Sequence, residues 1–211
     1  MGRRALLMDR DGTICEEVGY LDHVDKVRLL AGSGEAIRRA NEIGLQTVML
    51  TNQSGVARGC FDEDLLSDAH ERLRELLAEE GARLDGIYYC PHHPEHGEPP
   101  YRRACPCRKP APGLLWRARD EMGIDLAGSY MVGDRFSDLE AGARGGAVPI
   151  LVLTGAGKEE LRQHGAAPPV APARVAADLL EALRWILQRE RDDAPQDADA
   201  AAAQGAAAGE P

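Results

Sequence analysis

The sequence is poor in aromatic residues, has no long apolar run and carries no excess of positive charge. Aromatic side chains make up 4% of its 211 residues, and the formal net charge is −10. Without a basic stripe or an aromatic stacking platform, a nucleic acid is not expected as a partner. No apolar run approaches the roughly 20 residues that span a bilayer, and the run after Arg4 is far too short for a secretory signal. We therefore expect a soluble protein that stays in the cytoplasm and has no membrane partner.

Residues 192 to 211 differ in composition from the rest of the chain. They contain five acidic residues and no Lys or Arg, which accounts for half of the net charge, and nine of the twenty are Ala. Such a segment buries too little apolar area to offset the entropy of ordering it. We expect residues 1 to 191 to form one folded domain and residues 192 to 211 to be a disordered tail.

Short apolar runs alternate with segments of helical spacing. The runs that predict strands are 5–8, 45–50, 86–90, 129–132 and 149–153. The segments that predict helices include 33–43, 62–80, 112–122 and 174–190. Strands that alternate with helices favour a parallel sheet covered on both faces. We therefore predict an α/β fold with a doubly wound parallel sheet. No long insertion follows the first or second strand, so no large cap domain is expected.

Two aspartates follow the first predicted strand, in the sequence Asp9-Arg10-Asp11-Gly12-Thr13. Side chains two positions apart on a strand point the same way, so Asp9 and Asp11 can reach one ligand together. At the carboxyl end of a parallel strand, two such carboxylates suit Mg²⁺ and a phosphate group. A surface turn would use the same residue types, so this motif needs support from other parts of the chain.

That support comes from the residues after the other predicted strands. The polar groups are Thr51-Asn52-Gln53-Ser54-Gly55 after the second strand, Gly133-Asp134-Arg135 with Asp138 after the fourth, and Arg108-Lys109-Pro110 before the helix at 112. Each group alone could be a helix cap or a solvated charge. Because ligands bind outside the carboxyl ends of the strands in such sheets, their joint occurrence indicates one phosphate-binding site.

Residues 91 to 112 are rich in Pro and have almost no apolar side chain to anchor them. A loop of this length needs another source of order. Cys90, His92, Cys105 and Cys107 form a C-x-H and a C-x-C pair with twelve residues between them, which suits a tetrahedral structural zinc site in a loop of about 90–109. His93 or His96 could replace His92 as the ligand. Disulfides are the weaker alternative, because a cytoplasmic chain stays reduced.

In this order the motifs resemble the haloacid dehalogenase-like phosphatases, over nearly the whole chain to about residue 190. More narrowly, five stretches look like those of the D-glycero-D-manno-heptose-1,7-bisphosphate 7-phosphatase family, which has a zinc-stabilised loop on a Rossmann-like fold. These stretches are Asp9 to Thr13, Gly19-Tyr20, Thr51 to Gly59, Cys90 to Pro94 and Cys105 to Pro110. The resemblance implies a Mg²⁺-dependent phosphatase that converts a sugar bisphosphate to heptose 1-phosphate for nucleotide-activated heptose and lipopolysaccharide.

The resemblance also implies catalytic roles. Asp9 would be the nucleophile that forms an aspartyl-phosphate, and Asp11 would act as general acid and then as general base. Thr51 and Lys109 would hold the transferring phosphoryl group, to which the Asn52 amide would also donate.

Metal and substrate contacts follow from the same resemblance. Mg²⁺ would lie between Asp9, Asp134 and the backbone carbonyl of Asp11, with Asp138 orienting the site without binding the metal. Arg108 would clamp a distal phosphate or sugar hydroxyls. The remaining residues expected to select the substrate are Glu17, Val18, Gly19, Tyr20, Gln53, Ser54 and Arg135. Zinc at the Cys/His motif would fix Arg108 and Lys109, which follow Cys107 directly, so its removal should lower activity.

Other functions stay open at this stage. Histidinol-phosphate phosphatases share the aspartate pair and the zinc loop, although in that branch Asp typically follows the Gln that corresponds to Gln53. A non-catalytic phospholigand-binding protein on the same fold would be expected to lack the nucleophile or the acid. A glycosyltransferase with a metal-binding D-x-D motif would need a nucleotide-binding glycine pattern. We expect a monomer, because no large apolar stripe remains once the core is assigned.

Overall fold

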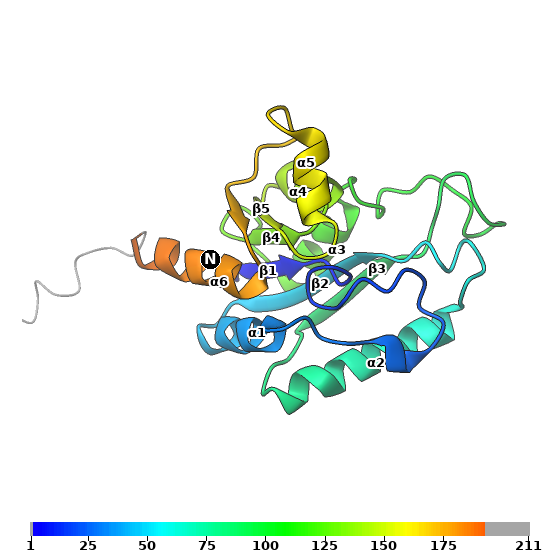
Figure 1. The fold of residues 1–211 in the computed structure, drawn as a ribbon, viewed down its shortest axis with the longest axis horizontal. Coiled ribbons are helices and arrows are strands. Elements are labelled where there is room, and N and C mark those ends of the chain that lie inside the picture. Colours follow the sequence, from blue (N-terminus) through cyan, green and yellow to red (C-terminus); the bar gives the residue numbers. More distant parts are fainter. Residues whose placement is uncertain (1, 193–211) are drawn as a thin grey trace, which may run out of the picture.

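The computed structural model describes residues 2–192, which form a three-layer α/β domain (Figure 1). Its single sheet has six parallel strands in the order β3-β2-β1-β4-β5-β6. The strands are β1 (Ala5–Met8), β2 (Gln46–Asn52), β3 (Gly86–Cys90), β4 (Tyr130–Gly133), β5 (Val148–Val152) and β6 (Arg174–Ala176). The doubly wound fold expected from the sequence is therefore confirmed. The tail expected to be disordered lies, from residue 193 on, outside the described residues.

Helices cover both faces of the sheet. They are α1 (Ser33–Glu42), α2 (Glu63–Glu79), α3 (Gly113–Met122), α4 (Phe136–Gly145), α5 (Gly157–His164) and α6 (Leu179–Asp192). Leu6 and Met8 of β1 pack with buried residues of α1, α2 and α6, whereas Ala5 and Leu7 pack with residues of α3 and α4. This alternation follows from the two-residue period of a strand. It explains why every residue of β1 is apolar.

The helix expected at 62–80 shows how local sequence signals work in this chain. Asp62 accepts a hydrogen bond from the Leu65 amide at 2.8 Å and so caps the first turn of α2. Leu66, Leu73 and Leu77 are buried along one face of the helix. The helix ends one residue before Glu80, and Gly81 follows with a positive φ of 72°.

The prediction of a helix at 174–190 is wrong for its first residues. Arg174–Ala176 form the edge strand β6, paired with Ile150–Val152 of β5. The helix begins only at Leu179, where the Asp178 carboxylate accepts a hydrogen bond from the Glu181 amide at 2.8 Å. Pairing with β5 is a long-range contact, and three residues are too few to show a strand period in the sequence.

The strand order reverses between β1 and β4. Leu6 to Met8 pair with β2 on one side and with β4 on the other, so the chain winds outward in both directions from this point. In such sheets the crevice at the carboxyl end of the reversal is where ligands bind. Among residues 2–192 no second sheet covers this edge. In the same range, no helix has both the length and the apolar character needed to cross a membrane.

Candidate active site

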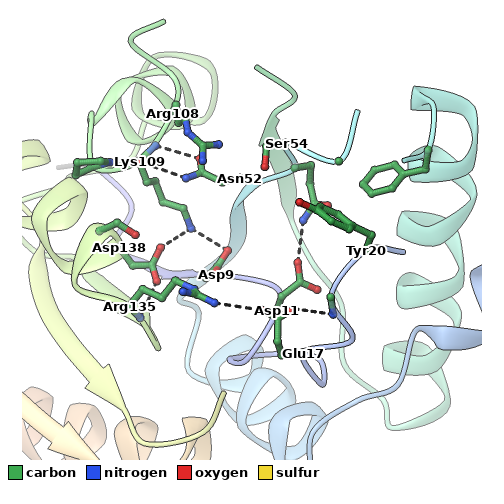
Figure 2. Close-up of a pocket in the computed structure, with 16 residues that line it drawn as sticks. Asp9, Asp11, Glu17, Tyr20, Asn52, Ser54, Arg108, Lys109, Arg135 and Asp138 are labelled. Atoms are coloured by element: carbon green, nitrogen blue, oxygen red, sulfur yellow. Dashed lines mark hydrogen bonds and ion pairs between the residues drawn. The ribbon is translucent and has the colours of Figure 1, made fainter. Parts of the chain in front are cut away.

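A cleft of about 720 Å³ opens at the carboxyl edge of β1, β2 and β4 (Figure 2). Asp9 lies at its base, directly after β1, with Lys109 and Asp138 on one side and Asp11 on the other. The residues expected from four separate sequence segments thus meet at one place. The cleft is open to solvent, because its walls are loops and helix ends.

Lys109 is the buried cation of the site, with 3% of its surface exposed. Its Nζ atom lies 2.8 Å from Asp9 Oδ1 and 2.7 Å from Asp138 Oδ1, and it donates to the Leu50 carbonyl at 2.6 Å. Burial by itself lowers the pKa of Lys109, but the Asp138 and Asp9 carboxylates outweigh it and hold that pKa above its ordinary value. Lys109 is therefore a permanent positive charge beside Asp9.

Asn52 holds Lys109 in place. Its side-chain Nδ2 donates to the Lys109 carbonyl at 3.0 Å, and its Oδ1 accepts from the Lys109 amide at 3.1 Å. The sequence led us to expect that the Asn52 amide donates to a phosphate oxygen. In the structure both polar atoms of this side chain contact the backbone of Lys109, so Asn52 positions the lysine.

Asp134 is fully buried near Asp9 and has one unsatisfied oxygen. Its Oδ2 accepts from the Ala156 amide at 2.7 Å, whereas its Oδ1 has no hydrogen-bond partner. The Gly12 backbone, with φ of 76°, comes so close that a Cβ atom there would lie 2.2 Å from Asp134 Oδ2. Burial, and then the charges of Asp9 and Asp138, raise the pKa of Asp134 to about 7.

These carboxylates fit a hard divalent cation. Oxygens of Asp9, Asp134 and Asp138 lie within 4.8 Å of one another, and all three residues are buried. One lysine cannot neutralise three carboxylates, and an all-oxygen donor set suits Mg²⁺. Both oxygens of Asp138 are already engaged, one by Lys109 and the other by the Arg135 amide at 3.1 Å. The free Asp134 oxygen is therefore the better ligand, and Asp138 orients Lys109.

Asp11 points away from this carboxylate group. Arg10 donates from Nε to Asp11 Oδ1 at 3.0 Å and from Nη2 to Asp11 Oδ2 at 2.9 Å. Gln53 Nε2 donates to Asp11 Oδ2 and to Thr51 Oγ1, both at 2.9 Å. The Asp11 side chain is thus separate from the cluster of Asp9, Asp134 and Asp138, and only its backbone carbonyl remains available to a metal ion.

Sequence reasoning assigned no role to Arg10. A signal was present, because a charged residue directly after a buried strand must be paired if it is buried too. Gln53, expected to contact the substrate, lines the cleft but uses both ends of its amide in the network with Arg10, Asp11 and Thr51.

The rim of the cleft carries two arginines on opposite sides (Figure 2). Arg108 donates to the His92 carbonyl at 3.3 Å, and Arg135 Nη2 lies 3.5 Å from Glu17 Oε2. The other expected substrate residues that line the cleft are Gly19, Tyr20 and Ser54. Val18 differs from them, because its side chain packs against the core rather than lining the cleft.

The Cys/His motif converges as expected. The Sγ atoms of Cys90, Cys105 and Cys107 lie 3.0 to 3.4 Å from one another, and His92 Nδ1 lies 3.4 Å from Cys107 Sγ. These separations exceed an S–S bond of about 2.05 Å and are of the order found between ligands of a tetrahedral metal ion. His93 is not part of the cluster, since its Nε2 lies 3.2 Å from Arg58 Nη2.

The loop that carries this cluster is fastened to the rest of the site. Tyr101 donates to Glu63 of α2 at 3.1 Å. Gly97, with φ of 86°, packs so closely that a Cβ atom there would lie 1.8 Å from the Ala57 carbonyl. The Cys/His cluster therefore connects Arg108 and Lys109 to the loop that follows β2.

Comparison with known proteins gives consistent results. The HAD-hydrolase-like family model matches residues 106–182. The D-glycero-beta-D-manno-heptose-1,7-bisphosphate 7-phosphatase of Yersinia pestis is 39% identical over 89% of this chain and 92% of that protein. Its namesake from Escherichia coli strain K12 is 44% identical over 72% of this chain and 80% of that protein. The crystal structure of D,D-heptose 1,7-bisphosphate phosphatase from B. bronchiseptica, complexed with magnesium and phosphate, is similar with a TM-score of 0.79 and 36% identity, covering 88% of this chain and 99% of that one.

Proposed function

Because the chain belongs to the D-glycero-D-manno-heptose-1,7-bisphosphate 7-phosphatase family of the haloacid dehalogenase-like hydrolases, we propose that its cleft removes the 7-phosphate through a covalent intermediate on Asp9. The observation that carries this proposal is the placement of the Asp9 carboxylate. It lies at the base of the cleft, held by the Lys109 ammonium at 2.8 Å, and a second carboxylic residue, Asp11, lines the same cleft.

The reaction has two balanced steps. In the first, an oxygen of Asp9 attacks phosphorus, the bond from phosphorus to the C7 oxygen breaks, and Asp11 gives its proton to that oxygen. In the second, Asp11 takes a proton from water, the water oxygen attacks phosphorus, and the bond to Asp9 breaks. The products are heptose 1-phosphate and inorganic phosphate, and both aspartates return to their starting states.

Lys109 and Thr51 stabilise the transferring group. The Lys109 ammonium neutralises charge on the phosphoryl oxygens, while Thr51, buried at the end of β2, is oriented by its hydrogen bond from Gln53. Mg²⁺ bound by Asp9, Asp134 and the Asp11 carbonyl would neutralise repulsion between Asp9 and the phosphate.

The rim arginines would recognise the part of the substrate that does not react. Arg108 and Arg135 line the cleft with their guanidinium groups, which suit bidentate contacts with a phosphate. A sugar that carries phosphates at both ends can place one at Asp9 and the other between these arginines. Glu17, Gly19, Tyr20 and Ser54 would complete the contacts to the sugar.

The Cys/His cluster would hold zinc. Its three sulfurs and one ring nitrogen come together from the two ends of the Pro-rich loop and fill all four positions of a tetrahedral site, so none is left for a substrate. We assign it a structural role, because its last ligand, Cys107, directly precedes the two cations Arg108 and Lys109.

The decisive test is phosphate release, with Mg²⁺ present, from the α and β anomers of heptose 1,7-bisphosphate and from histidinol phosphate. We expect fast loss of the 7-phosphate only from the bisphosphates, with the β anomer, for which the relatives are named, turned over faster. Asp9→Asn should reduce turnover by about 10⁴-fold or more, as is typical when a nucleophile is removed. Asp64→Asn, at an exposed position of α2, is the matched control.

The other outcomes point to other functions. A preference for histidinol phosphate would place the chain in that branch of the superfamily. No release from any of the three substrates, with tight binding of the bisphosphate, would support a non-catalytic phospholigand-binding protein.

We infer further that the chain works as a monomer in the cytoplasm and supplies heptose 1-phosphate for nucleotide-activated heptose. Three cysteines in one metal cluster need a reducing compartment. The large exposed apolar side chains among the described residues are Tyr20, Ile43 and Trp116, which lie in the loop after β1, directly after α1 and in α3. Sedimentation should give the mass of one chain, 22.8 kDa, and a mass of twice that value would contradict the monomer.

A further inference from the structure

Arg10, between the two aspartates of the motif, is a buried cation with an unusual set of partners. Only 4% of its surface is exposed. Its side-chain hydrogen bonds go to the two oxygens of Asp11 and to Gln53 Oε1 at 3.0 Å. Its remaining nitrogen, Nη1, is buried without a partner. The guanidinium is therefore held by Asp11 and Gln53, two residues that line the cleft.

The Asp11 carboxylate is correspondingly enclosed by donors. It receives two hydrogen bonds from Arg10, in the planar fork that suits a carboxylate, and a third from Gln53. Burial disfavours the charge on Arg10, and Asp11 offsets this cost by its own charge and hydrogen bonds, so the pKa of Arg10 stays above its ordinary value. Neither group has another charged hydrogen-bond partner among residues 2–192, so each fixes the orientation of the other.

Gln53 joins this pair to the phosphate-binding side of the site. The same Nε2 atom that donates to Asp11 also donates to Thr51 Oγ1, and its Oε1 accepts from Arg10. A closed network thus connects the group that moves protons to the group that holds phosphate. A carboxyl that gives a proton in one step and takes one in the next needs the same orientation twice, and small displacements of such a group are costly.

We propose that Arg10 and Gln53 are positioning residues that hold the Asp11 carboxyl for both proton transfers. The proposal rests on the function proposed above. For Arg10 it predicts a loss in kcat rather than in substrate binding, because this side chain is buried and does not line the cleft.

The test compares Arg10→Met and Arg10→Lys with the wild-type enzyme on heptose 1,7-bisphosphate. Both variants should lose about 10²-fold in kcat, the size of effect expected from misplacing a catalytic group by about 1 Å, with KM unchanged. Lysine should not restore activity, because an ammonium is a point charge and cannot contact both oxygens in a fork. Arg162→Met, on the exposed surface of α5, is the control and should behave as wild type.

A double-mutant cycle separates positioning from a purely structural effect. If Arg10 acts through Asp11, adding Arg10→Met to Asp11→Asn should cost less than a further twofold in kcat. If the losses in kcat of the two single variants multiply in the double variant, the proposal is overturned, because Arg10 then acts independently of Asp11. Gln53→Leu is tested in the same cycle and is expected to lose about tenfold in kcat. If Arg10→Met does not fold, the cycle of Gln53→Leu with Asp11→Asn decides the question.

The outcomes keep this proposal apart from the proposed function. Wild-type kcat in Arg10→Met and Gln53→Leu, with an active wild-type enzyme and an inactive Asp9→Asn, would overturn the positioning role alone. Absence of phosphatase activity in the wild-type protein would overturn the function, and the positioning role with it.

Discussion

Lys109→Met is expected to lower kcat by about 10² to 10³-fold and to destabilise the fold. The catalytic loss is of the size seen when one preorganised donor to a developing negative charge is removed. The structural loss arises because Asp9 and Asp138 would share a buried region without their common cation, and breaking such a buried pair costs about 3–5 kcal/mol. Steady-state kinetics and urea unfolding measure the two effects separately.

Lys158→Met is the matched control for this prediction. Lys158 lies on the exposed surface of α5, so its replacement should change neither kcat nor the unfolding midpoint. A Lys109→Met protein that retains wild-type kcat would show that the lysine only neutralises the aspartates. A variant that loses kcat without losing stability would mean that the carboxylates find another partner or take up protons.

Removal of the zinc proposed for the Cys/His cluster is expected to lower activity by about 10²-fold without the metal touching phosphate. The reason is that Arg108 and Lys109 follow Cys107 directly, and displacement of catalytic groups by about 1 Å has effects of this size. Cys107→Ser should bind less than one equivalent of zinc and show a lower melting temperature. Zinc content by atomic emission, thermal unfolding and turnover with excess Mg²⁺ are the measurements.

Cys60→Ser provides the control for the zinc prediction. Cys60 is an exposed free thiol outside the cluster, so this variant should keep its zinc and its activity. Full activity in a Cys107→Ser protein that is demonstrably free of zinc would contradict the role assigned to the metal. Restored activity on adding zinc to a wild-type protein stripped by a chelator would support it.

Sequence alone determined those features that depend on neighbours in the chain. The apolar runs and the caps of α2 follow from residues a few positions apart, and so does the position of Asp9 directly after β1. The convergence of the Cys/His motif was also predictable, because its residue types and spacing are those that metal sites use. These signals were enough to predict the doubly wound fold and to identify the resemblance to the family.

The tertiary structure decided which side chains contact one another inside the site. Lys109 meets Asp9 across 100 positions of sequence, and Asn52 pairs with the backbone of Lys109 across 57. The strand β6 also depends on a long-range contact, because its three residues become a strand only through pairing with β5. Long-range contacts of this kind leave no periodic pattern in the chain. The orientation of Asp11 toward Arg10 is local in sequence, yet burial decides it, because a guanidinium enclosed by the fold must take the nearest carboxylate as its partner.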